Sequence, residues 1–262
     1  MASIALTHLT TLLQARKLDG TLTRPLTTGL PVTSTGVEAL DQTLGGGDPG
    51  EQAGGWPRGH VSEVIGPASS GRTSVVMATL AAVTARGGVV ALVDVADRCD
   101  PAGAAEAGVD LDRLLWVRGP SMTWGGPRST VGDLAVRRGL RTFDLIVRAG
   151  GFAVVVLDLA DVPERLVRAL PASTWLRLAH VFEGCDTVGL LVGTMPMGRS
   201  SGGVSLSLRG TGQWTGASAQ SRRLSGISVE AQVARSAMQV RVAHTAPGKA
   251  VSTCFLASSE IR

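Results

Sequence analysis

A short glycine-rich segment at residues 66–73, GPASSGRT, has the residue types and spacing of a phosphate-binding loop. Gly66 and Gly71 match the pattern GxxxxGK[ST], in which backbone N–H groups surround phosphate oxygens and a hydroxyl meets Mg²⁺. Thr73 supplies the hydroxyl, but Arg72 stands where the pattern has Lys. Because Arg is planar and wider than Lys, we expect weakened or altered nucleotide binding and poor hydrolysis. The alternative is a loop that shapes a turn and binds nothing.

Two acidic residues follow apolar runs that are typical of buried strands. Asp158 follows residues 153–157, where an Asp can hold the water shell of Mg²⁺ or can cap the next turn. Asp94 follows residues 89–93, and a capping role is favoured there. We expect no catalytic residue and no resident metal, and ATP with Mg²⁺ is a possible ligand. The candidate nucleotide site comprises Gly66, Ser69, Ser70, Gly71, Arg72, Thr73, Ser74 and Asp158.

The cysteines, histidines and apolar runs of the sequence argue against a metal site and a membrane segment. The cysteines, Cys99, Cys185 and Cys254, are odd in number and lack metal-ligand spacing, and the four histidines are scattered. This usage favours a reducing cytoplasm. The apolar runs are too short to cross a bilayer, and no secretory signal is visible at the start, so no membrane partner is expected.

The elements that must position this loop alternate between strand and helix. The strands are expected to be apolar throughout, which favours a parallel sheet that is covered by helices on both faces. Capping signals support two of the helices: Thr35 with Glu38 has capping-box spacing, and Asp100 precedes Pro101. We expect strands at 60–65, 89–93, 114–117, 152–157 and 187–192, and helices at 35–44, 74–86, 101–107, 130–148 and, in broken form, 163–183.

The pattern changes after about residue 200. Apolar and polar residues alternate at 204–208, 227–233 and 238–242, which indicates half-buried antiparallel strands. The predicted fold class is therefore α/β, with a mostly parallel sheet flanked by helices and antiparallel strands at the C-terminal end. Residues 1–28 are expected to form a helical arm, with its helix at 6–18, and a linker. Residues 29–262 form the core, whose part from about 200 to 262 is basic.

Charge is unevenly distributed along the chain. Residues 190–262 carry eight Lys and Arg against two Asp and Glu, whereas residues 1–189 carry 17 against 19. Such a segment suits a polyanion, and DNA of either strandedness is the expected partner. Trp214 lies near this region and can stack on a base or pack in the core, and the core is favoured. The expected DNA contacts are Arg199, Arg209, Arg222, Arg223, Arg235, Arg241 and Lys249.

Several segments, taken in order, resemble the core of RecA-type recombinases. They are residues 34–41 (STGVEALD), 55–65 (GWPRGHVSEVI), 66–74 (GPASSGRTS), 93–115 (VDVADRCDPAGAAEAGVDLDRLL) and 154–158 (VVVLD). The similarity runs from about residue 30 to 195 and implies a RecA-like fold. It also places the segment 200–203 (SSGG), beside Arg199, where RecA proteins have their second DNA loop.

Three positions depart from what the RecA resemblance implies for an active ATPase. The water-orienting Glu is expected two residues after Asp94, and that position is Ala96; Asp97 is one residue out of register. The strand that ends in a Gln sensor in RecA proteins ends here near Thr194. The first DNA loop is shortened as well. Together with Arg72, these departures imply a degenerate ATPase site.

A RecA-like core without its catalytic positions is similar to ImuA, the accessory family of bacterial mutagenesis cassettes. The segments most similar to that family are 45–47, 55–64, 107–119 and 174–186. This resemblance implies an SOS-induced role in DNA repair and translesion synthesis, with RecA, an ImuB-like polymerase-related protein and an error-prone polymerase as partners. The expected location is the cytoplasm, at the nucleoid. The alternative is an active DNA-dependent ATPase of the recombinase type.

Overall fold

The computed structural model describes residues 31–45, 54–120, 130–198, 202–218, 220–235 and 250–256. The expected helix at 6–18, its linker and the expected strand at 238–242 lie outside these residues. The chain divides into two compact units, residues 1–30 and 31–262, and the fold concerns the second.

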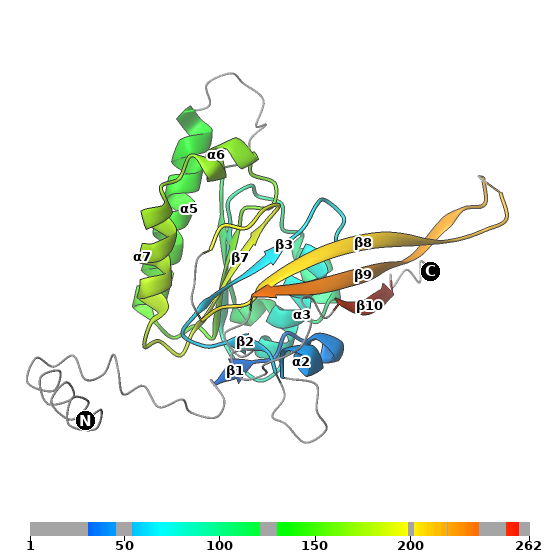
Figure 1. Ribbon diagram of the computed structural model, residues 1–262, viewed down its shortest axis with the longest axis horizontal. Coiled ribbons are helices and arrows are strands. Elements are labelled where there is room, and N and C mark those ends of the chain that lie inside the picture. The colour runs from blue at the N-terminus through cyan, green and yellow to red at the C-terminus, as the bar shows by residue number, and fades with distance from the viewer. Residues whose placement is uncertain are drawn as a thin grey trace, which may run out of the picture. The chain divides into compact units, whose positions relative to one another are not determined.

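One large sheet forms the centre of this unit (Figure 1). Its strands are β3 (Val61–Ile65), β4 (Val90–Asp94), β5 (Leu114–Arg118), β6 (Val154–Asp158), β7 (Val188–Gly193), β8 (Ser205–Thr215), β9 (Arg223–Arg235) and β10 (Ala250–Leu256). The order across the sheet is β10-β9-β8-β3-β7-β6-β4-β5. The strands from β8 to β5 pair in parallel, and β9 and β10 are antiparallel to their neighbours. The predicted fold class is confirmed.

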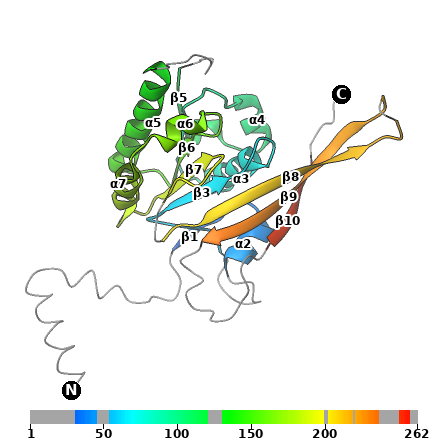
Figure 2. The same ribbon diagram turned by 45° about the horizontal axis from the view of Figure 1, so that its top comes forward.

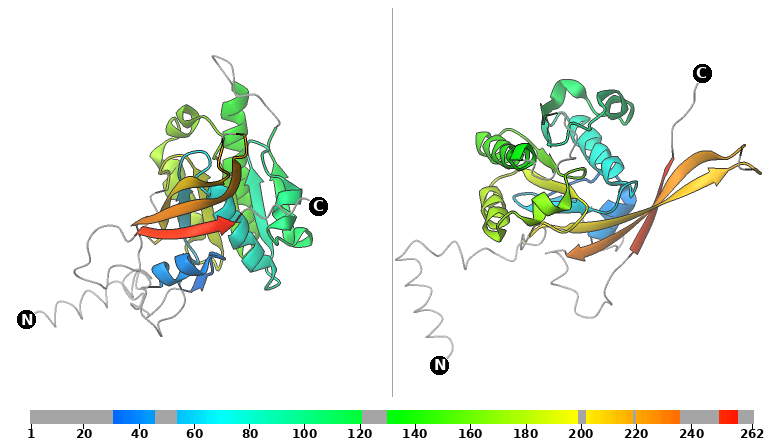
Figure 3. Two further views of the ribbon diagram at one scale, coloured as in Figure 1. Left: turned by 90° about the vertical axis from the view of Figure 1, so that its right-hand side faces the viewer. Right: turned by 90° about the horizontal axis from the view of Figure 1, so that it is seen from above.

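Helices cover both faces of the parallel strands (Figure 2). On one face lie α5 (Thr130–Ala149), α6 (Glu164–Arg168) and α7 (Ala172–Phe182); on the other lie α3 (Arg72–Thr84) and α4 (Pro101–Glu106). Each face has its own hydrophobic cluster, and β6 contributes to both because its side chains alternate between them. A central strand that is buried on both sides explains the unbroken apolar runs in the sequence. The right-hand view of Figure 3 shows the two helical layers from above.

A small unit before the phosphate loop was only partly expected from the sequence. The two-stranded sheet of β1 (Val32–Thr33) and β2 (Trp56–Pro57) accompanies α2 (Glu38–Leu44). The expected capping box is wrong: the helix begins at Glu38, and the Thr35 hydroxyl bonds to Val37 in its own turn. The Asp41 carboxylate instead accepts a 2.8 Å hydrogen bond from the Thr35 N–H. By contrast, Asp100 caps α4 as predicted, accepting from the Ala102 N–H at 3.1 Å.

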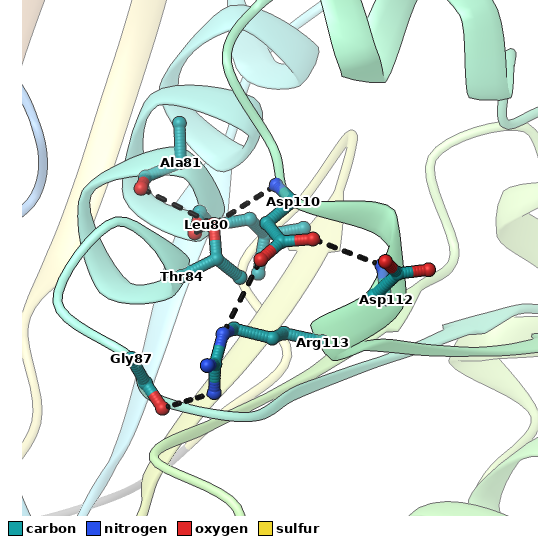
Figure 4. A network of polar contacts seen from close by, with 7 residues as sticks. All are labelled: Leu80, Ala81, Thr84, Gly87, Asp110, Asp112 and Arg113. Atoms are coloured by element: carbon teal, nitrogen blue, oxygen red, sulfur yellow. Dashed lines mark hydrogen bonds and ion pairs between the residues drawn. The ribbon is translucent and has the colours of Figure 1, made fainter.

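Polar contacts join the end of α3 to the start of β5 (Figure 4). The Thr84 hydroxyl lies over the last turn of α3 and accepts a 3.1 Å hydrogen bond from the Asp110 N–H. Asp110 also accepts from the Asp112 N–H, which begins the 3₁₀ turn Leu111–Arg113. Arg113 pairs with Asp110 at 3.2 Å and donates to the Gly87 carbonyl at 2.7 Å. These contacts fix the turn after α3 against the approach to the edge strand.

Strands β8 and β9 form a long hairpin that extends past the rest of the sheet (Figures 1 and 2). β3 pairs with β8 only at Ser205–Ser207, and β10 pairs with β9 from Gly226 to Gln232. Beyond these pairings, Trp214 and Thr215 pair only with the partner strand of the hairpin. The alternation at 204–208 and 227–233 is confirmed as strand, whereas β10 was not predicted.

Candidate functional site

The phosphate loop connects β3 to α3, as the sequence indicates. Its backbone is unusual at two positions: Ser69 has φ 59° and Gly71 has φ 93°, both in the left-handed region. A positive φ is uncommon for Ser and is tolerated in tight turns that serve a site. Gly71 is the N-cap of α3, so the turn delivers the chain directly into the 13-residue helix.

Backbone donors at the start of α3 are available to an anion. Among the described residues, nothing accepts a hydrogen bond from the N–H groups of Gly71, Arg72 or Thr73, whereas the Ser70 N–H bonds to the Pro67 carbonyl. Thr73 itself is exposed. Unpaired N–H groups at a helix N-terminus attract negative charge, and phosphate is the usual ligand of such a turn.

The root of the hairpin packs directly against the phosphate loop. A Cβ added at Gly66 would lie 2.5 Å from the Leu208 carbonyl oxygen, and one at Gly71 would lie 2.6 Å from a Val229 methyl group. From the hairpin side, a Cβ at Gly210 would lie 2.3 Å from the Ser69 carbonyl oxygen. Glycine at these three positions therefore permits the close approach of β8 and β9 to the loop.

Arg72 does not extend into solvent as a phosphate-binding side chain would. It is only 8% exposed, and its Nη1 is buried with no hydrogen-bond partner among the described residues. The Ser70 hydroxyl is likewise buried and without a partner there. Leaving such groups unpaired costs free energy, so they mark a place where a ligand or ordered water completes the bonding.

The two strand-ending carboxylates stand side by side. Asp94 and Asp158 are register partners at the ends of β4 and β6. The pKa of Asp158 is raised to about 6, mainly by burial and also by the charges of Asp94 and Asp161, although the Ala160 N–H hydrogen bond and the Arg72 charge act to lower it. Ala160 donates that bond at 2.8 Å, so Asp158 caps its turn, and the charge of Arg72 also acts on its carboxylate.

Asp94 serves mainly as a cap, as the sequence favoured. Its Oδ2 accepts from the N–H groups of Arg98 and Cys99 at 2.8 and 2.7 Å, and from the Trp116 indole at 3.3 Å. Its Oδ1 is buried with no partner in the described part of the chain. One side of this carboxylate thus holds the loop after β4, and the other remains available to a ligand or water.

Position 96, where the RecA resemblance implies a catalytic carboxylate, is occupied by alanine. Ala96 is buried and has no group that can orient water. Its neighbour Asp97 is held in a two-point ion pair by Arg118, at 2.8 and 3.0 Å, and this contact lowers the pKa of the carboxyl. Arg118 in turn stacks over Trp116, with its guanidinium carbon 4.7 Å from the ring centroid. The Asp97 carboxylate is therefore engaged by Arg118 of the edge strand β5.

At the end of β7, the Thr194 hydroxyl donates a 3.0 Å hydrogen bond to Glu164. The Gln that the RecA resemblance implies at the end of this strand is absent, and Thr194 stands there. This neighbourhood links β7 to α6.

Sequence reasoning missed Glu63, a buried acid in β3. Its two carboxylate oxygens accept from the Met197 N–H at 2.7 Å and from the Ser205 hydroxyl at 2.9 Å. It therefore anchors both sides of residues 199–201, which lie outside the described part of the chain. The signal was present in the sequence: an acid inside an apolar strand must be paired when it is buried.

The predicted DNA contacts are only partly brought together. Arg209, Arg222 and Arg223 are exposed on the hairpin, with Arg209 opposite Glu230 in the strand register. Arg235 ends β9. Arg199, Arg241 and Lys249 lie outside the described residues, so their placement is not tested.

Trp214 contradicts the favoured core interpretation. It is 54% exposed near the end of β8, because the hairpin there extends beyond β3 and β10. The guanidinium carbon of Arg222 lies 5.4 Å from its ring centroid.

Two other classes of site receive no support. Within the described ranges, no three His, Cys, Asp or Glu side chains gather to hold a metal ion, and no helix is long and apolar enough to span a bilayer. Burial and nearby carboxylates raise the pKa of the Cys99 thiol to about 11, so it is not a reactive thiolate near neutral pH.

The comparison with known families agrees with this geometry. The model of the RecA N-terminal domain matches residues 21–164, more than half of the 262-residue chain. The chain belongs to the RecA family. The matched part includes the phosphate loop, Ala96 and Asp158, whereas β7 and the hairpin lie beyond it.

Alignments with individual RecA proteins also cover about half of this chain. The chain is similar to protein RecA of Borrelia hermsii, with 32% identity over 134 residues, which is 51% of this chain and 32% of that protein. It is 39% identical to protein RecA of Synechococcus sp. WH7803 over 125 residues, 48% of this chain and 27% of that protein. For Lactobacillus acidophilus RecA the identity is 34% over 131 residues, 50% and 30% of the two chains. The chain thus spans about a third of the length of these curated relatives.

Proposed function

We propose that this RecA-family chain is a non-hydrolysing accessory protein of SOS-induced translesion synthesis, similar to ImuA, which binds DNA and protein partners. The observation that carries the proposal is the burial of Arg72 at the position of the phosphate-binding lysine. A buried guanidinium cannot follow the charge that develops on a transferring phosphoryl group, which is the task of the lysine.

The loop retains part of what a nucleotide needs. The unpaired N–H groups of Gly71, Arg72 and Thr73 suit phosphate oxygens, and the exposed Thr73 hydroxyl with Asp158 suits a hydrated Mg²⁺. When bound, ATP with Mg²⁺ would supply a charged ligand that orders the loop. Ala96 leaves the attacking water without a base, and Asp97 is held by Arg118, so we propose binding without turnover.

DNA binding is assigned to the basic hairpin and to the basic residues near it. Phosphate contacts of this kind are independent of sequence, and their strength falls steeply with salt because bound counterions are released. The proposed contacts on described residues are Arg209, Arg222 and Arg223, which are exposed on one hairpin.

The protein partners proposed are RecA itself, an ImuB-like polymerase-related protein and an error-prone polymerase, in the cytoplasm at the nucleoid. The apolar face expected for the helix at 6–18 can pack on its own core, which is the more common outcome, or can dock on a neighbouring RecA-type core. We propose the second and assign the RecA contact to residues 1–28. Deletion of residues 1–28 is expected to abolish co-purification with RecA. Unchanged co-purification would remove that assignment.

The DNA part is tested by titrating a labelled single strand against the full chain without nucleotide. For three phosphate contacts we expect affinity to fall about 20-fold when salt rises from ~50 to ~200 mM. Replacing Arg209, Arg222 and Arg223 by Gln is expected to remove most of that dependence. The matched control replaces three exposed arginines of α5, Arg137, Arg138 and Arg141, with the same change in charge. Equal effects of the two triple variants would contradict the placement on the hairpin.

An active recombinase-type ATPase is the competing function, and the unpaired loop donors are the feature that favours it. It requires DNA binding that depends on ATP, as well as turnover. Binding of the single strand without nucleotide favours the accessory role.

A further inference from the structure

The far end of the β8–β9 hairpin carries an exposed aromatic and aliphatic pair. Trp214 and Leu224 are register partners across the two strands, next to a bulge at Gln213. They are 54% and 42% exposed, although both are large and apolar. Exposed apolar groups that lie directly opposite each other mark a contact surface more often than isolated ones do.

Two neighbours hold the Trp214 ring in place. A Cβ at Gly212 would lie 3.0 Å from the indole Nε1 and 3.3 Å from a Leu224 methyl group, so the glycine makes room for both side chains. The Arg222 guanidinium carbon lies over the ring, 5.4 Å from its centroid. An indole that is positioned by a cation and an aliphatic neighbour loses little side-chain freedom when a ligand stacks on it.

The surroundings indicate the class of ligand. Among the described residues 202–218 and 220–235, Trp214 and Leu224 are the only exposed large hydrophobic side chains, and Glu230 is the only acid. The tip is otherwise composed of Gly, Ala, Ser, Thr and Gln with Arg222 and Arg223. This apolar area is small for a protein hot spot, whereas one aromatic ring beside cations is what an unstacked base and its phosphates require.

We propose that the hairpin tip binds single-stranded DNA by stacking a base on Trp214, while Arg222 and Arg223 contact the adjoining phosphates. This inference rests on the proposed DNA binding and adds a site and a strand preference to it. Bases in a duplex are already stacked on one another, so a duplex offers this tip only its phosphates.

The test compares two labelled oligomers of equal length, oligo(dT) and an abasic strand that keeps the phosphates and lacks the bases. The full-length chain is expected to bind oligo(dT) more tightly than the abasic strand. Trp214→Ala is expected to weaken oligo(dT) binding about tenfold and leave abasic binding unchanged, because one base–aromatic stack is lost. Trp214→Phe keeps a ring and is expected to retain most of the affinity.

The control is Leu176→Ala on α7, which removes a side chain that is also 54% exposed, away from the hairpin. It is expected to bind both oligomers as the original chain does. Equal affinity of the original chain for the two oligomers would overturn the stacking site while leaving DNA binding intact. So would unchanged oligo(dT) binding by Trp214→Ala, which would make the tip a protein contact. Failure to bind either oligomer would overturn the proposed DNA function itself.

Discussion

Asp158, at the end of a sheet strand, interacts electrostatically with Arg72 of the phosphate loop. Its carboxylate lies at the end of β6, next to Asp94 on β4, and it feels the charge of Arg72. Arg72 alone does not offset partial burial and the neighbouring carboxylates, and the pKa of Asp158 is therefore raised to about 6. The unbound protein thus holds an unfavourable negative charge at this position, which a divalent cation would stabilise.

Replacing Asp158 by Asn should stabilise the fold near and above neutral pH. The folded pKa is higher than the unfolded value, so the charged Asp158 costs stability as pH rises from about 4 to about 6. We expect Asp158→Asn to gain about 1–3 kcal/mol at pH 8, and to gain almost nothing below pH ~4, where both forms are neutral. Asn can still accept the Ala160 hydrogen bond.

Urea unfolding of the two chains at a series of pH values measures this difference. A gain that is equal at all pH values would show that Asp158 is not charged at a cost in the folded protein.

At the residue scale, the sequence predicts sites whose residues are consecutive in the chain. The phosphate loop was identified because its residues are consecutive and sit between a strand and a helix. The burial of Arg72 and the capture of Asp97 by Arg118, 21 residues later, depend on the assembled sheet and have no local signal. Glu63 had a signal, since an acid in a buried strand needs partners, but the identity of those partners is a tertiary property.

At the scale of elements, the phosphate loop and the hairpin form one packed unit. Gly66, Gly71 and Gly210 bring β8 and β9 against the loop, and the same hairpin carries Trp214 at its far end. A ligand that moves the loop must therefore also displace the hairpin root or be accommodated by it, because packed interiors resist small shifts.

The loss of folding stability in Gly71→Ala, compared with the loss in Gly87→Ala, measures this packing. Both glycines have left-handed backbone, at φ 93° and 82°, but nothing lies within 4 Å of a Cβ at Gly87. We expect Gly87→Ala to cost about 1 kcal/mol of backbone strain. Gly71→Ala should cost a further ~1–3 kcal/mol, because its methyl overlaps Val229.

Chemical denaturation of the two variants gives both values. Equal losses would contradict the close packing of β9 on the loop.

Prediction of strands from the sequence succeeded where both faces of the strand are buried. The strands β4, β6 and β7 are apolar, apart from the Asp that ends β4 and β6, because helices cover both of their faces. The α4 cap follows from the local pair Asp100 and Pro101. The Thr35 capping box failed because Asp41 takes the Thr35 N–H. Trp214 was misassigned because a period-two pattern shows which side of a strand is apolar, and does not show where the neighbouring strands end.

At the scale of the whole molecule, the chain combines the fold of the RecA family with Arg72 and Ala96 at the positions where the RecA resemblance implies Lys and Glu. The match to the RecA N-terminal domain covers the loop and both strand-ending carboxylates. Arg72 and Ala96 depart from what the RecA resemblance implies for an active ATPase, and Asp97 is paired with Arg118. Under the proposed function, binding without turnover is the property that the fold provides. The proposal makes the basic hairpin the DNA-binding surface of the molecule.

Phosphate release from ATP with Mg²⁺ and single-stranded DNA tests this account most directly. The full chain is expected to release phosphate no faster than Asp158→Ala, because neither has a carboxylate at position 96 or a lysine at position 72. Clear turnover by the full chain that Asp158→Ala abolishes would contradict the account.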